Sequence, residues 1–124
     1  MEGYSAKIAH VSKEISAKEK VMLKDTTNAL SLDELTQQGS LTIYPAYYAI
    51  LSIHNEKAED KDYNKYVIVD NGGTKYVTGS ESFFTSFEDI VDEMADSGEE
   101  SGIEIYRIPS KNYKGKEFIT CSIV

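Results

Sequence analysis

The chain has 124 residues, a mass of 13.9 kDa and a formal net charge of −8. With 40% hydrophobic and 27% charged residues, it has the composition of one globular domain rather than of a disordered chain. Cys121 is the single cysteine, which excludes an internal disulfide and favours a reducing compartment. No apolar run is long enough to span a bilayer and no signal peptide is recognisable, so we expect one cytoplasmic domain over residues 1–124.

The negative charge is concentrated in one part of the sequence. Residues 81–104 contain nine acids and no base, which leaves 12 acids against 13 bases in the rest of the chain. The net charge therefore does not exclude a surface elsewhere that binds a polyanion.

The first 38 residues predict a strand followed by short capped segments. Residues 7–11 fit a strand, and Ser16 with Glu19 fits a capping box that starts a helix. Residues 19–24 also fit a strand, and their periodicity does not separate the two alternatives. A second capping pattern follows at residues 31–34, and Gly39 can end that helical turn.

In residues 41–53 the odd positions read Leu, Ile, Pro, Tyr, Ala, Leu, Ile, whereas the even positions read Thr, Tyr, Ala, Tyr, Ile, Ser, His. This period-two alternation predicts one long strand with a single buried face. Pro45 predicts an edge or a bend within it, because proline cannot donate to a ladder. Three segments follow: a charged loop (56–62), a strand (63–69), and a returning strand (74–78) after the turn Asp70-Asn71-Gly72-Gly73.

An amphipathic helix comes next, with apolar residues at helical spacing from Phe83 to Met94 and a cap at Ser80 or Ser82. Strands are expected at residues 103–108 and 116–124, joined by a turn. This order predicts a mainly β fold, namely a five-stranded antiparallel barrel of the oligonucleotide-binding (OB) type, with one helix before the last hairpin.

Metal, cofactor and catalytic sites find no support in the sequence. His10 and His54 are far apart, and Cys121 has no second ligand at a metal-binding spacing. The acidic run after Asp92 lacks the glycine and the last carboxylate of a calcium loop, and no phosphate-binding loop occurs. We therefore expect a protein that is not an enzyme and that needs no cofactor.

The nine tyrosines are the remaining signal. If Leu51 and Ile53 point inward, Tyr44 and Tyr48 point outward, and Tyr66, Tyr76 and Tyr106 can extend the same surface. Several rings on one open sheet face form a platform on which bases stack, at about 1–3 kcal/mol for each base. Tyrosines are also good strand formers that half-bury in any sheet, and this alternative stays open.

The last predicted turn places lysines around one ring. Residues 110–116 read Ser-Lys-Asn-Tyr-Lys-Gly-Lys, next to Arg107. In OB barrels the loop between the last two strands contacts the oligonucleotide, where lysines neutralise phosphates. A solvated turn is the alternative.

Order and spacing also carry a family resemblance. Its elements are Gly39 before the long strand, the hairpin segment Gly72-Gly73-Thr74-Lys75-Tyr76, the helix at 83–94 and the ending at 103–124. On these features residues 39–124, about two-thirds of the chain, resemble the single-stranded DNA-binding proteins of small Bacillus phages that replicate linear genomes by protein priming.

The resemblance implies an acidic OB-type protein that coats displaced single strands during DNA replication in the cytoplasm of a bacterial host. A stacking tyrosine of that family falls on Tyr76 and another near Tyr63. A third falls at about Ile50, which has no ring, and Tyr48 is the nearest substitute.

The leading hypothesis is a sequence-tolerant protein that binds single-stranded nucleic acid, with DNA favoured, and that works beside phage or host replication proteins. The expected contacts are Tyr44, Tyr48, Tyr63, Tyr66, Tyr76, Tyr106 and Tyr113 for bases, and Arg107, Lys111, Lys114 and Lys116 for phosphates. A second hypothesis is an acidic protein-binding module, such as a phage inhibitor of a host enzyme that mimics nucleic acid through Asp89, Asp92, Glu93, Asp96, Glu99 and Glu100. A small-ligand binder is a third.

Overall fold

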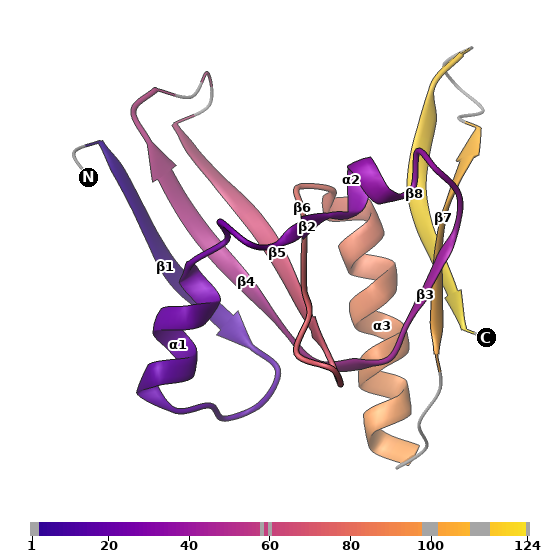
Figure 1. The fold of residues 1–124 in the computed structure, drawn as a ribbon, viewed down its shortest axis with the longest axis horizontal. Helices are drawn as coiled ribbons and strands as arrows, with labels where there is room; N and C mark the ends of the chain where they lie inside the picture. Colours follow the sequence, from indigo (N-terminus) through magenta and orange to yellow (C-terminus); the bar gives the residue numbers. More distant parts are fainter. Residues whose placement is uncertain (1–2, 58, 60, 98–101, 110–114, 124) are drawn as a thin grey trace. The chain divides into compact units, whose positions relative to one another are not determined.

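The computed structural model describes residues 3–57, 59, 61–97, 102–109 and 115–123. In chain order its elements are β1 (Tyr4–Val11), α1 (Ala17–Lys24), β2 (Leu30–Ser31), α2 (Leu32–Leu35), β3 (Leu41–Ile43), β4 (Pro45–Asn55), β5 (Asp62–Asp70), β6 (Lys75–Thr78), α3 (Glu81–Ser97), β7 (Ile103–Pro109) and β8 (Glu117–Ile123) (Figure 1). The fold is mainly β, with one long helix before the C-terminal strands, as the sequence predicts.

The strands form two sheets, and the chain divides into two compact units. One sheet has the order β1-β4-β5-β6-β2 and the other the order β3-β7-β8. The first unit comprises residues 1–30 and 46–79, and the second comprises residues 31–45 and 80–124. Both sheets are open within the described residues, so the predicted closed five-stranded barrel is not confirmed.

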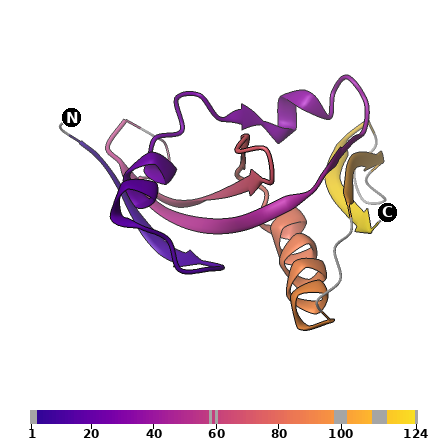
Figure 2. The ribbon, with the colours of Figure 1, turned by 60° about the horizontal axis from the view of Figure 1, so that its bottom comes forward.

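The first unit is an antiparallel sheet with α1 on one face (Figure 2). Its core consists of Ile15, Leu23, Ala49, Leu51, Ile53, Val67 and Val69. Leu23 is the one buried side chain of α1, so this residue anchors the helix to the sheet. The strand predicted at residues 7–11 is confirmed and is longer than expected, since β1 begins at Tyr4.

The capping box that the sequence predicts starts α1. Ser16 Oγ accepts a hydrogen bond from the backbone N–H of Glu19, and Glu19 Oε1 accepts one from the N–H of Ser16, both at 3.1 Å. These two bonds satisfy N–H groups that have no partner inside the helix. The alternative of a strand over residues 19–24 is wrong.

The turn between β5 and β6 forms around one carboxylate. Asp70 Oδ1 accepts hydrogen bonds from the N–H groups of Gly72 (3.0 Å) and Thr74 (2.9 Å). Gly73 has a φ of 87°, which an L side chain rarely adopts, so glycine is required there. The predicted hairpin turn is confirmed.

The second unit packs α3 against the β7–β8 hairpin. Phe83, Phe84 and Phe87 are buried, which confirms the apolar face of the predicted helix. β3 pairs with β7 in antiparallel register, from Leu41 opposite Ile105 to Ile43 opposite Ile103. Among the described residues, no helix is both long and apolar enough to cross a bilayer.

The single long strand predicted for residues 41–53 is two strands. β3 ends at Ile43 and β4 begins at Pro45, and the two belong to different sheets. Pro45 is the position where the sequence predicts a bend, and its missing N–H favours a break in the ladder there. The period-two pattern continues across the break, which is why the sequence does not reveal it.

Candidate nucleic-acid interface

The two units differ in charge. The first unit contains nine lysines against nine acids and is neutral overall, whereas the second contains four bases against twelve acids and carries the whole net charge of −8. Six of the nine tyrosines also belong to the first unit. A surface that accepts a polyanion is therefore expected on the first unit.

The strand register sorts the tyrosines of the first unit by face. Ile68 lies opposite Tyr76 in the β5–β6 ladder, and Tyr66 lies opposite Thr78. Tyr66 and Tyr76 therefore share a face, opposite to the face of Val67. This part of the sequence prediction is confirmed.

The predicted exposure of two of these rings is wrong. Only 2% of Tyr48 and 6% of Tyr66 is exposed, so neither offers an open ring face to a base. Tyr48 contacts the ring of His10, with centroids 5.9 Å apart. For these two positions the alternative interpretation holds, in which tyrosine fills a strand position and buries its ring.

Tyr63 and Tyr76 are half-buried. Tyr63 packs against the core of the first unit. The Tyr76 hydroxyl donates to Asp70 Oδ2 at 3.2 Å, and burial together with the Asp70 carboxylate raises the pKa of this hydroxyl. Each ring keeps part of its surface accessible.

Tyr44 is the most exposed of the predicted rings that the structure describes, with 55% of its surface accessible. A Cβ atom added at Gly102 would lie 3.0 Å from Cζ of Tyr44, so the ring lies directly against the backbone of Gly102. The glycine thus supports one part of the ring while the rest faces solvent, an arrangement suited to stacking.

Among the remaining predicted residues of the second unit, Tyr106 and Arg107 have structural contacts. Tyr106 shares a hydrogen bond with Ser122 Oγ (2.6 Å). Arg107 donates from Nε to Thr36 Oγ1 (2.9 Å) and from its terminal N–H to the carbonyl of Asp33 (2.5 Å). Arg107 therefore joins β7 to the α2 segment. Lys116 is exposed, whereas Lys111, Tyr113 and Lys114 lie outside the described residues.

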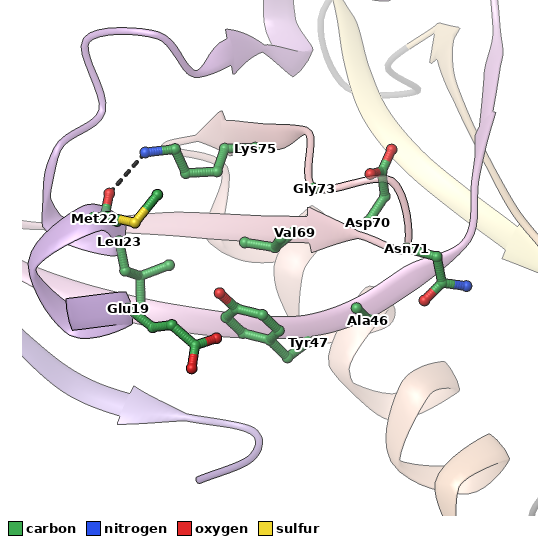
Figure 3. Close-up of a pocket in the computed structure, with 10 residues that line it drawn as sticks. All are labelled: Glu19, Met22, Leu23, Ala46, Tyr47, Val69, Asp70, Asn71, Gly73 and Lys75. Atoms are coloured by element: carbon green, nitrogen blue, oxygen red, sulfur yellow. Dashed lines mark hydrogen bonds between the residues drawn. The ribbon is translucent and has the colours of Figure 1, made fainter. Parts of the chain in front are cut away.

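A pocket of about 290 Å³ lies beside α1 in the first unit (Figure 3). Its lining comes from α1, from the start of β4 and from the β5–β6 hairpin: Glu19, Met22, Leu23, Ala46, Tyr47, Val69, Asp70, Asn71, Gly73 and Lys75. None of these residues is among the predicted contacts. We refer to this site as the α1 pocket.

Tyr47 is the ring of the α1 pocket. It is half-buried, and burial followed by the nearby Glu19 carboxylate raises the pKa of its hydroxyl. The ammonium group of Lys13 lies 4.9 Å from the centroid of the Tyr47 ring, a cation–π distance. One aromatic face and one cation are thus held together.

Lys75 fixes the helical wall of the α1 pocket. Its Nζ donates to the carbonyls of Met22 (2.7 Å) and Asp25 (2.5 Å), at the C-terminal end of α1. A cation is favourable at this position, because the last carbonyls of a helix have no partner within it.

One sequence signal could have identified these two residues. Tyr47 has the same parity as Leu51, and Lys75 has the same parity as Val77, so both occupy the core-facing side of their strands. A lysine in such a position needs polar partners. The period-two alternation of residues 41–53 by itself places Tyr47 on the core-facing side and does not indicate that it lines a pocket.

Polar contacts also surround His54, outside the α1 pocket. His54 lies between two carboxylates, with Nδ1 2.8 Å from Asp62 Oδ1 and Nε2 2.7 Å from Glu56 Oε1.

Burial raises the pKa of the Cys121 thiol to about 11. Within the described part of the chain, no group of three or more His, Cys, Asp or Glu residues is arranged to hold a metal ion.

Comparisons of the chain with protein-family models, with curated proteins and with solved structures found no match.

Proposed function

We propose that the protein binds single-stranded DNA with little sequence preference and coats it during replication, as a phage-type protein. The observation that carries the proposal is the composition of the first unit. It combines six tyrosines with nine lysines and has no net charge, although the whole chain carries −8. The acidic segment that argues against DNA binding belongs entirely to the second unit.

The first unit offers both kinds of contact that single strands require. Tyr47 and Tyr63, on the side of the sheet that carries Val67, and Tyr76, on the opposite side, keep accessible ring surface for bases. Lys18, Lys20 and Lys24 are exposed on α1, beside the α1 pocket, where they can neutralise phosphates. Tyr44 is a further stacking candidate on the second unit.

The order of the elements supports an OB-type relationship, which is part of the proposal. The meander β4–β5–β6, the helix α3 and the final hairpin β7–β8 follow the order of an OB barrel. The resemblance of residues 39–124 to phage single-stranded DNA-binding proteins points the same way.

The first test is a fluorescence titration with oligo-dT of about thirty nucleotides, at about 50 and 200 mM salt, with a matched duplex as control. We expect single-strand binding that weakens with salt, and no duplex binding. Absence of binding at low salt contradicts the proposal.

A set of variants then locates the phosphate contacts. Replacing Lys18, Lys20 and Lys24 by Gln lowers the salt slope by about 0.7 for each lost contact. Lys57→Gln serves as the matched control, because Lys57 is exposed in the β4–β5 loop of the same unit. Equal slopes for the triple variant and the unmodified protein place the phosphate contacts elsewhere.

A second candidate function rests on the second unit, which carries the entire net charge of −8. Glu81, Asp89 and Glu93 are exposed on α3. In this alternative the acidic helix mimics phosphates and binds the basic groove of a host enzyme. The side chains of Asp96, Glu99 and Glu100 lie outside the described residues.

A further inference from the structure

The polar groups of the α1 pocket fall into two classes. Lys75 is held by two carbonyls, both oxygens of Asp70 accept hydrogen bonds, and Glu19 Oε1 accepts from the N–H of Ser16. In contrast, the Tyr47 hydroxyl and the Asn71 side-chain amide form no hydrogen bond with a described residue. The pocket therefore has two polar groups available for a ligand.

We propose that the α1 pocket binds one unstacked nucleobase of the bound single strand. This inference rests on the proposed DNA-binding function and assigns its base contact to residues that the sequence did not indicate. Leu23, Val69 and Ala46 contribute apolar lining, while Tyr47 supplies an aromatic ring. The Met22 thioether adds a polarizable contact for a ring system.

The charges of the α1 pocket favour a base over a phosphate. Glu19 and Asp70 line the pocket with two carboxylates and Lys75 lines it with one ammonium, while the Lys13 ammonium lies 4.9 Å from the centroid of the Tyr47 ring. The Lys75 ammonium already donates to two carbonyls and the Lys13 ammonium lies over the Tyr47 ring, so an anion entering the pocket would meet two carboxylates while both nearby cations are engaged. A neutral planar heterocycle meets no such repulsion, and the phosphates remain outside with the α1 lysines.

Asn71 supplies the hydrogen-bonding complement of a base edge. Its amide carries both a donor and an acceptor, which match the paired donor and acceptor groups of a nucleobase. Asn71 is exposed in the β5–β6 turn, and Figure 3 shows its amide pointing away from the α1 wall, at the rim of the pocket. Contact with a base that stacks on Tyr47 therefore requires the exposed Asn71 side chain to turn toward the pocket.

The chain offers its own reporter for this site. Of its three methionines, Met22 lines the α1 pocket and Met94 lies in α3 of the second unit. The protein is labelled with ¹³C-methyl methionine and titrated with oligo-dT of about thirty nucleotides, or with an abasic oligomer of equal length that keeps only the sugar–phosphate chain. A base in the pocket shifts the Met22 methyl resonance by its ring current.

We expect oligo-dT to shift the Met22 resonance and the abasic oligomer to leave it in place. If oligo-dT binds in the fluorescence titration but Met22 does not respond, the pocket proposal is overturned and DNA binding stands. Equal Met22 shifts with both oligomers overturn it as well, because the occupant is then the backbone. If oligo-dT does not bind at all, the proposed function itself fails.

Two substitutions test the contacts. Asn71→Ala lowers oligo-dT affinity by about 5- to 10-fold, whereas Asn64→Ala, at an exposed position of β5, leaves it unchanged. Tyr47→Leu abolishes the base-dependent Met22 shift, and Tyr47→Phe retains it because the ring remains. Thermal melts of all four variants check the fold. An Asn71→Ala affinity equal to that of Asn64→Ala contradicts the assigned amide contact.

Discussion

At the scale of single residues, we expect His54 to make the stability of the fold depend on pH. Both of its ring nitrogens lie within hydrogen-bonding distance of a carboxylate, so both donate only when the ring is protonated. The bonds to Asp62 and then to Glu56 raise the pKa of His54. The same contact with His54, and a second one with Lys61, lower the pKa of Glu56.

These shifts define a pH window. A raised histidine pKa stabilises the fold below the ordinary value of about 6.5, and this contribution disappears as the pH rises through the raised pKa. The Glu56 contribution is present above about 4.3 and disappears in acid. As the pH rises above about 6.5, we expect the Tm of the unmodified protein to fall relative to that of His54→Gln. Parallel Tm profiles for the two proteins would contradict the assignment.

The hydrogen bond from Arg107 to the buried Thr36 hydroxyl is a second contact whose contribution to stability a point substitution can test. Thr36 is buried, donates from Oγ1 to the carbonyl of Leu32 at 2.8 Å and accepts from Arg107. Thr36→Val leaves the guanidinium without this acceptor, so we expect a loss of about 1–3 kcal/mol in the free energy of unfolding. Thr36→Ser keeps the hydroxyl and serves as the matched control. If the denaturant melts of Thr36→Val and Thr36→Ser coincide, the Thr36 hydroxyl does not stabilise the fold as the acceptor for Arg107.

The residue scale also marks the limit of prediction from sequence. Period-two alternation correctly assigned Tyr66 and Tyr76 to a shared face. It did not reveal that Tyr48 and Tyr66 are buried, because alternation specifies the side of a sheet and not what covers it. Nor did it reveal the hydrogen bonds of Arg107, since its partners Asp33 and Thr36 lie about seventy positions away in the sequence.

At the scale of elements, α1 is a short helix fixed at both ends. Ser16 caps its start, and Lys75 binds the carbonyls at its C-terminal end. A helix of eight residues is marginal by itself in water, so these contacts and Leu23 hold it on the sheet.

Removing one cap tests this dependence. Ser16→Ala lowers the free energy of unfolding by about 1 kcal/mol and speeds amide exchange in α1 before the rest of the first unit. Ser16→Thr, which can still cap, serves as the control. Exchange in α1 that stays as slow as in β4 would show that the helix does not need its cap.

Elements with local signals were predicted well. The Ser16 capping box, the Ser31 cap, the Asp70 turn and the apolar stripe of α3 each depend on residues a few positions apart. The break between β3 and β4 depends on which strand each one pairs with, and β3 pairs with β7, a partner far along the chain. The same non-local choice separates two open sheets from one closed barrel.

At the scale of the whole molecule, the separation of charge distinguishes the two proposed functions. Asp89→Lys with Glu93→Lys changes two exposed positions of α3 and shifts the net charge from −8 to −4. For a DNA-binding protein, weaker repulsion raises oligo-dT affinity a few-fold at low salt, with less effect at high salt. For a phosphate mimic, the same change abolishes partner binding. Asp89→Asn with Glu93→Gln is the neutral control, and fluorescence anisotropy measures the affinity.

The interleaving of the two units has a consequence for biosynthesis. The first unit has all its strands once Gly79 has left the ribosome, but β3, within residues 31–45, has no partner until β7 emerges. At roughly 5–20 residues per second, Leu41–Ile43 waits for seconds as an unpaired strand edge on the nascent chain. We therefore expect partial translation products that end before β7 to be the species most prone to aggregate. The interval between the synthesis of β3 and that of β7 is then the stage at which a ribosome-bound chaperone is needed most.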